Sequence, residues 1–206
     1  MSFIKNRGEK LPVKYLNIKS LSCFLACFFL FISVLQAAEP TRVRMHTSLG
    51  NMEIELNVEK SPRTVKNFLN YVNSRYYEGL IFHRVISGWL IQGGGYDEEL
   101  SIFETDKPVR NEATNGLKNV RGTIAMARHW DPNSADSQFF INLKDNASFD
   151  HQSRSPRGYG YAVFGKIISG MDVADAIGNA ETHVVEEFDK DVPVETIFIK
   201  KVEVID

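Results

Sequence analysis

Cysteine is missing from the sequence after residue 38. The chain has 206 residues and two cysteines, and both of these, Cys23 and Cys27, lie near the N-terminus. The 168 residues after position 38 therefore cannot form a disulfide with one another, use a thiolate nucleophile or build a thiolate-rich zinc site. They are numerous enough to bury the core of one domain, which we expect over residues 39–206.

Patterns that mark metal, phosphate or hydrolase sites are also missing. The five histidines show no ligand spacing such as His-Glu-x-x-His, and Gly93-Gly94-Gly95 is not followed by the Lys-Ser/Thr of a phosphate loop. No Gly-x-Ser-x-Gly element occurs. We therefore expect no metal and no cofactor, and we interpret the glycine triplet as backbone freedom where another segment passes close by.

An excess of positive charge is absent from the same part of the chain. The first 38 residues contain five basic residues and one acidic residue, which leaves 19 Lys and Arg against 25 Asp and Glu, a net charge of −6. A domain of this charge has little means of binding nucleic acid by counterion release, so we expect no nucleic-acid partner.

The sequence has only one long apolar run, and it is short for a membrane span. Residues 21–35 carry no charge and follow a basic region, whereas a transmembrane helix needs about 20 apolar residues. Small residues before Glu39 complete the pattern of a secretory signal. We expect residues 1–38 to be a signal peptide cleaved after Ala38. An uncleaved anchor, which would bring the protein to the membrane, is the alternative, since Gln36 stands where a small residue is preferred.

The rest of the chain is typical of a mainly β domain. Short alternating or apolar runs predict strands, and Ser61 and Pro62 are a favourable N-cap and first residue for an amphipathic helix. Many short strands with few helices favour a closed antiparallel barrel or a sandwich, with the helices covering its ends. The expected strands lie in residues 42–56, as two strands around a turn at 48–51, in 79–92, as two strands split at 87–88, and in 122–126, 139–143, 161–168 and 194–205; the expected helices cover 62–75 and 171–177.

Two segments combine apolar residues with a few polar ones in a way that a core alone does not explain: residues 82–95, and residues 122–129 followed by 137–142. Together with residues 163–166, these segments resemble the cyclophilin peptidyl-prolyl isomerases. The resemblance runs from about Arg42 to the C-terminus and, within that family, points to the periplasmic bacterial branch. The matching motifs are Phe82-His83-Arg84-Val85-Ile86, Gln92-Gly93-Gly94, Gly122-Thr123-Ile124-Ala125-Met126-Ala127, Ser137-Gln138-Phe139-Phe140-Ile141 and Val163-Phe164-Gly165-Lys166.

The resemblance implies an eight-stranded closed antiparallel β-barrel capped by two α-helices. It also implies isomerisation of X-Pro bonds in unfolded or exported proteins, in the periplasm if the leader is a signal. Rotation about such a bond is opposed by about 18–20 kcal/mol of amide resonance, so catalysis has to favour the twisted, deconjugated form. A hydrogen-bond donor aimed at the prolyl nitrogen and an apolar pocket for the ring suffice, without nucleophile or cofactor.

The resemblance also assigns the site residues. Arg84 is implied as the donor, with its permanently charged fork of N–H groups, and Gln92 as the residue that orients it. His83 should point away from Arg84 on a strand, and a direct role for it is left open. The residues implied in substrate binding are Trp89, Leu90, Gln92, Ala127, Arg128, Gln138, Phe140, Phe149 and Tyr161.

Several positions depart from the better-known eukaryotic pattern. Arg128 stands where an asparagine is usual, Tyr161 where a histidine is usual, and Ser148 where a tryptophan is usual. Because that indole helps to hold the cyclic peptide cyclosporin, weak or no cyclosporin binding is expected. An insertion at 151–160 lies beside the expected pocket. A proline-binding chaperone, with isomerisation incidental, is the alternative function, and a purely structural role is the third.

Overall fold

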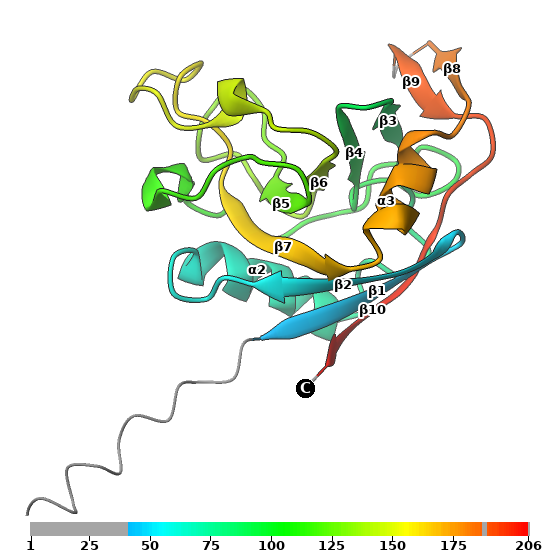
Figure 1. The fold of residues 1–206 in the computed structure, drawn as a ribbon, viewed down its shortest axis with the longest axis horizontal. Coiled ribbons are helices and arrows are strands. Elements are labelled where there is room, and N and C mark those ends of the chain that lie inside the picture. The colour runs from blue at the N-terminus through cyan, green and yellow to red at the C-terminus, as the bar shows by residue number, and fades with distance from the viewer. Residues whose placement is uncertain (1–40, 187–188, 206) are drawn as a thin grey trace, which may run out of the picture. The chain divides into compact units, whose positions relative to one another are not determined.

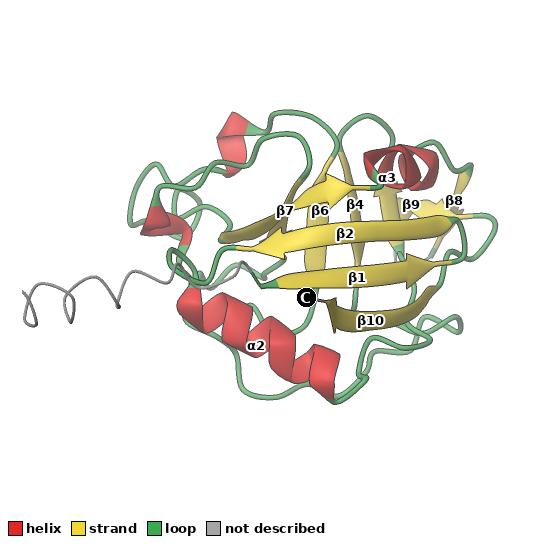
Figure 2. Ribbon diagram, turned by 60° about the horizontal axis from the view of Figure 1, so that its bottom comes forward, coloured by secondary structure: helices red, strands yellow, loops and turns green. Residues whose placement is uncertain are grey.

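The computed structural model describes residues 41–186 and 189–205, and the leader expected over residues 1–38 lies outside them. Eight strands form one antiparallel sheet in the order β10-β1-β2-β7-β5-β6-β4-β3. Two helices accompany it, α2 (Pro62–Asn73) and α3 (Met171–Gly178), which lie on opposite sides of the curled sheet (Figure 2). The strands are β1 (Arg42–Thr47), β2 (Gly50–Leu56), β3 (Arg84–Ile86), β4 (Leu90–Gly93), β5 (Thr123–Met126), β6 (Phe139–Asn142), β7 (Val163–Ser169) and β10 (Ile199–Ile205).

The sheet curls into a barrel-like shape but is not a fully closed barrel, so the word "closed" in the prediction was too strong. Its two edge strands, β10 and β3, do not pair with each other. The segments just before them meet instead in one isolated bridge, Ile81↔Phe198, supported by hydrogen bonds such as the one from the Phe82 amide to the Ile197 carbonyl, 2.9 Å long. The sheet is therefore nearly closed by a short seam.

Alternation along the strands separates the two faces of the sheet. In β1, every second residue is buried, and the same holds in β2 from Met52 onward. The inward residues form one large core with α2, in which Phe68 packs against Tyr77, Phe139 and Phe164 at centroid separations of 5.2–6.0 Å. This core fixes the strand register that positions the other face.

Helix α2 begins at Pro62 as predicted, but Ser61 does not cap it with its side chain. The Ser61 hydroxyl is fully buried and donates to the Val163 carbonyl at 2.7 Å. The carboxylate of Glu112, from the long loop between β4 and β5, accepts the Arg63 and Thr64 amides at 3.2 and 2.9 Å. The cap is therefore supplied by a distant residue, and the same contact orders the long loop.

The C-terminal strand is shorter than predicted, because residues 194–197 make no β-bridge and Phe198 makes only the isolated bridge to Ile81. They lead back to the sheet from a hairpin formed by β8 (Thr182–Val185) and β9 (Asp189–Pro193), which pair only with each other. The Val194 amide donates to Glu181 and the Phe198 amide to the Ser48 hydroxyl, so neither joins β1. The hairpin is an addition to the predicted architecture and lies beside β3 (Figure 1).

The described part of the chain also contains two short 3-10 helices, η2 (Ala113–Asn115) and η3 (Ala147–Phe149). Within residues 41–186 and 189–205, neither α-helix has the length and apolar character needed to cross a membrane.

Candidate functional site

The predicted donor lies at one end of a row of residues that crosses five strands. Arg84 on β3 pairs with Gln92 on β4, and Gln92 pairs with Phe140 on β6. Phe140 in turn pairs with Ala125 on β5, and Ala125 with Val163 on β7. Residues opposite one another in neighbouring strands project to the same face, so the row passes from a cation through an amide to apolar side chains on the face opposite the main core.

The apolar end of this row is a second, smaller hydrophobic cluster. Leu90, Ala125, Phe140 and Val163 are its buried members, and six of the nine residues predicted to bind substrate belong to it or pack against it. The Phe149 ring lies 5.5 Å from the rings of both Trp89 and Phe140, and 5.0 Å from that of Tyr161. The six predicted residues brought together here are Trp89, Leu90, Ala127, Phe140, Phe149 and Tyr161.

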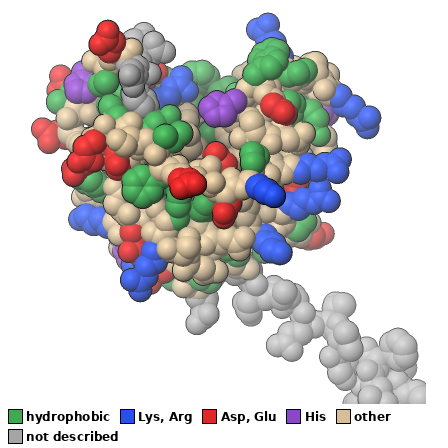
Figure 3. All heavy atoms as spheres, turned by 180° about the vertical axis from the view of Figure 1, so that it is seen from behind, with side chains coloured by type: hydrophobic (Ala, Val, Ile, Leu, Met, Phe, Trp, Pro, Cys, Tyr) green, Lys and Arg blue, Asp and Glu red, His purple; other side chains and the backbone are tan. Residues whose placement is uncertain are grey.

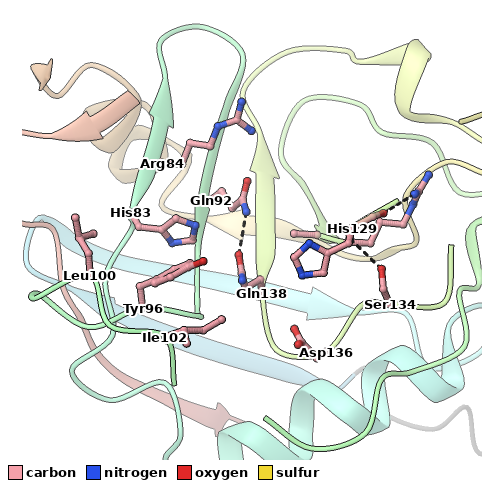
Figure 4. Close-up of a pocket in the computed structure, with 12 residues that line it drawn as sticks. His83, Arg84, Gln92, Tyr96, Leu100, Ile102, His129, Ser134, Asp136 and Gln138 are labelled. Atoms are coloured by element: carbon pink, nitrogen blue, oxygen red, sulfur yellow. Dashed lines mark hydrogen bonds between the residues drawn. The ribbon is translucent and has the colours of Figure 1, made fainter. Parts of the chain in front are cut away.

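The remaining predicted residues line an adjoining open pocket of about 590 Å³ (Figure 4). Its volume lies in the range of sites that bind small molecules or short peptide segments. Ala127 belongs to both the pocket and the apolar cluster, and so connects them. The lining residues are His83, Arg84, Gln92, Tyr96, Leu100, Ile102, Ala127, Arg128, His129, Ser134, Asp136 and Gln138.

Two glutamines join the two walls of the pocket. The Gln92 amide Nε2 donates to Oε1 of Gln138 at 3.0 Å, which orients both side chains (Figure 4). The glycine triplet permits this arrangement, because a Cβ at Gly95 would lie 2.5 Å from Cγ of Gln138. Gly94 has φ +82°, a conformation that side chains rarely adopt. The interpretation of the triplet as a place of close approach is therefore confirmed.

Arg84 is half-buried, with 39% of its side chain exposed. Its Nε lies 3.4 Å from Oδ2 of Asp191, a residue of β9 whose own side chain is 15% exposed. Sequence reasoning did not single out Asp191, because more than a hundred residues and no motif connect it to Arg84.

His83 lines the same pocket as Arg84, so the prediction that it points the opposite way is wrong. It lies just before β3, where strand alternation does not yet apply, and its ring packs against that of Tyr96 at a centroid separation of 4.6 Å and a tilt of 60°. Burial, and secondarily the charge of Arg84, lowers the pKa of His83 from 6.5 to about 4. The ring is therefore neutral near pH 7 and forms part of the pocket wall.

Arg128 uses its side chain within the chain itself. Its guanidinium donates to the Gly160 carbonyl at 3.0 Å and to the Pro156 carbonyl at 2.8 Å, and it lies 4.8 Å above the Tyr161 ring. These contacts hold the insertion at 151–160 beside the apolar cluster. A substrate can therefore bind the backbone near Arg128, whereas the Arg128 guanidinium already donates its hydrogen bonds to these carbonyls.

The charges around the site are unevenly distributed. Seen from behind, most of the visible Asp and Glu side chains lie on the side that carries the β8–β9 hairpin, whereas Lys and Arg gather on the opposite side and also lie along the lower edge of the hairpin side (Figure 3). Among the described residues, no group of three or more His, Cys, Asp or Glu side chains is arranged to hold a metal ion. The chemistry available at the site is therefore hydrogen bonding from a fixed cation beside an apolar, aromatic surface.

Comparison with known proteins agrees with this geometry. Residues 42–204 match the family described as "Cyclophilin type peptidyl-prolyl cis-trans isomerase/CLD". The chain is 48% identical to peptidyl-prolyl cis-trans isomerase A of Dickeya dadantii over 96% of this chain and 98% of that protein. It is 46% identical to isomerase B of Escherichia coli over 79% of this chain and 98% of that protein.

Solved structures give the same result. A cyclophilin-type isomerase of Cryptosporidium parvum matches with a TM-score of 0.66 and 28% identity, over 81% of this chain and 98% of that one. The same Cryptosporidium protein in the presence of the dipeptide Ala-Pro matches with a TM-score of 0.65 and 28% identity, over 80% of this chain and 99% of that one. The curled eight-stranded sheet, the row from Arg84 to Val163 and these matches lead to one conclusion: the chain belongs to the cyclophilin-type peptidyl-prolyl cis-trans isomerases.

Proposed function

We propose that this protein accelerates cis–trans isomerisation of X-Pro bonds in polypeptides, with Arg84 as the donor to the prolyl nitrogen. The observation that carries the proposal is the strand row in which Arg84 and Gln92 continue into Phe140. A proline ring seated on the cluster around Phe140 brings its nitrogen toward the polar end of the row. The structure of a family member in the presence of Ala-Pro supports a proline-containing substrate.

The proposed mechanism needs no covalent intermediate. When the X-Pro bond twists, the nitrogen loses conjugation and its lone pair becomes a hydrogen-bond acceptor, which it is not in either planar form. A preorganised donor then stabilises the twisted state more than the planar ones, and an effect of this kind contributes about 10²–10³ in rate. Gln92 and Gln138, joined by their hydrogen bond, are positioned to hold the flanking peptide backbone.

Replacing the arginine tests the mechanism. Arg84→Ala should lower kcat/KM on a proline-containing tetrapeptide at least tenfold, measured by a protease-coupled or NMR-exchange assay. Arg84→Lys keeps the charge but loses the planar fork, so it should recover only part of the rate.

Arg44→Ala is the matched control for this test. Arg44 is 37% exposed and ion-paired with Glu53 at 2.7 Å, much as Arg84 is with Asp191, but it lies on β1. Its loss should leave turnover unchanged. Full activity of Arg84→Ala would refute the role proposed for Arg84.

We further propose that the clients are exported proteins, because a charge-free run over residues 21–35 follows a basic region. In a bacterial cell, the protein should then be recovered from the periplasm without residues 1–38. Recovery of the full-length chain from the membrane fraction would favour the uncleaved anchor instead.

We also propose that the protein binds cyclosporin weakly, because of the side chain at position 148. Ser148 is exposed on η3, next to Phe149, and offers no large aromatic surface at that position. Cyclosporin should therefore inhibit the tetrapeptide assay poorly, and Ser148→Trp should strengthen the inhibition.

A further inference from the structure

The β8–β9 hairpin lies outside the eight-stranded sheet, next to its edge strand β3 (Figure 1). Val192 is buried and pairs with His183 across the hairpin, so this part of β9 is anchored against the domain. Asp191 is the preceding residue, and its carboxylate is largely shielded from solvent, since only 15% of its side chain is exposed. The hairpin therefore holds a negative charge at a defined place beside Arg84.

The closest contact with Asp191 is made at the Nε edge of the guanidinium. Oδ2 of Asp191 lies 3.4 Å from Nε of Arg84, as an ion pair without hydrogen-bond geometry. No nitrogen of Arg84 makes a hydrogen bond to any residue that the structure describes. An arginine held at Nε keeps its two terminal amino groups for another acceptor, and the planar fork then has a fixed direction.

The ion pair is better suited to orientation than to stability. Arginine has many rotamers, and a long side chain that is 39% exposed samples several of them unless something restrains it. Ion pairs at this degree of exposure contribute little to folding free energy, because water screens them. A donor displaced by as little as 1 Å can nevertheless lose much of its catalytic effect.

We propose that Asp191 is a positioning residue for Arg84, holding the guanidinium at Nε so that its terminal amino groups face the peptide. The hairpin is then a functional element, because it delivers this carboxylate to an edge strand that has no other acidic partner for Arg84 among the described residues. This inference rests on the proposed role of Arg84 as the donor.

The test is a set of variants assayed on the same tetrapeptide with the full chain. Asp191→Ala should lower kcat/KM roughly three- to tenfold, less than the ~10² that a full misplacement of the group can cause. The loss should appear in kcat, with KM changed little, because the orientation of the donor matters most in the twisted state. Asp191→Asn keeps an acceptor oxygen without the charge and should lie between Asp191→Ala and the native protein.

A control and a spectroscopic measurement separate positioning from a merely structural role. Glu195→Gln removes one negative charge from the exposed segment just after the hairpin, where Glu195 forms no ion pair with any described residue, and should leave kcat unchanged. The NMR resonance of the Arg84 Nε–H should shift in Asp191→Asn and Asp191→Ala but not in Glu195→Gln. If Asp191→Ala fails to fold, Asp191→Asn carries the test.

A double-mutant cycle distinguishes failure of this inference from failure of the proposed function. With Arg84 already replaced by alanine, Asp191→Ala should cause no further loss of kcat/KM. An additive loss, or a kcat in Asp191→Ala equal to or above that of the native protein, would overturn the positioning role while leaving Arg84 as the donor. Full activity of Arg84→Ala alone would instead overturn the proposed function itself.

Discussion

His83 is a titratable group enclosed between a permanent cation and an aromatic ring. It is 3% exposed, and its pKa falls to about 4 through burial and the nearby charge of Arg84. In the unfolded chain the same imidazole takes up its proton near pH 6.5. The unfolded state therefore binds more protons than the folded state between these two values, and acid favours unfolding.

The expected result is a pH-dependent loss of stability that belongs to His83. The contribution of neutral His83 to the free energy of unfolding is fully present above pH 6.5 and decreases as the pH falls toward 4, by about 3 kcal/mol in total. Urea denaturation at pH 7.5, 5.5 and 4.5 should show a smaller decrease for His83→Gln than for the native protein. Equal pH dependence of both proteins would contradict the neutral, buried state. Isomerase activity should be nearly flat over pH 5.5–8, since a pKa of about 4 keeps His83 in the pocket wall neutral throughout this range.

At the scale of elements, the long loop between β4 and β5 stabilises the helix that it crosses. The Glu112 carboxylate accepts two amides of the first turn of α2 and also the Thr64 hydroxyl at 2.8 Å. Helix N-termini leave amides without internal partners, and a negative group placed there also interacts favourably with the helix dipole.

Glu112→Ala should therefore destabilise the protein by about 1–2 kcal/mol, the usual cost of losing a helix cap. The measurement is the urea midpoint at constant m-value, followed by far-UV circular dichroism. Glu104→Ala is the control, because Glu104 lies in the same loop, is exposed and has no ion pair with any described residue. Equal midpoints for the two variants would mean that Glu112 is not the cap.

The elements differ in how far their local sequence predicts them. In β3 and β4, Arg84 and Gln92 lie on one face and Val85 and Ile91 lie in the core, as the alternation of side chains along a strand requires. Ser61 was expected to cap α2 because it stands at the right position, but its buried hydroxyl has a better partner in a strand a hundred residues away. Local pattern predicts which face a side chain occupies, whereas partners supplied by distant segments follow only from the assembled fold.

The sequence was limited in the same way in predicting the contacts of the site residues. The nine positions predicted to bind substrate came from the resemblance to the family, which covers the chain from about Arg42 to the C-terminus. Asp191 lies in a hairpin with no such motif, and its relation to Arg84 depends on how the chain turns after α3. Likewise, nothing in the sequence indicated that the Arg128 guanidinium would be taken up by the carbonyls of the insertion.

At the scale of the whole molecule, the first and last strands pair with each other. β1 and β10 are antiparallel neighbours along nearly their full lengths, from Arg42↔Ile205 to Thr47↔Ile199. Both contribute buried residues, such as Val43 and Val202, to the main core. Folding thus requires both ends of the domain to be present at once.

Residues 39–206 should consequently fold without the leader and unfold in urea in a single transition, with fluorescence and circular dichroism giving the same midpoint. Removal of residues 199–206 deletes β10 and should abolish cooperative unfolding and isomerase activity together. Separate transitions in the two signals, or retained activity without β10, would show that the sheet does not fold as one unit.

The row from Arg84 to Val163 also determines where the protein tolerates change in length. Because side chains alternate along a strand, inserting one residue into β4 would send Gln92 into the core and Ile91 into the peptide site. The packing of the core and the arrangement of the peptide-binding residues would both be disrupted. Loops carry no such constraint, and the insertion at 151–160 already lies beside the apolar cluster, held there by Arg128. Substrate preference can therefore be altered by engineering the length of that loop, while the sheet that carries the chemistry is left unchanged.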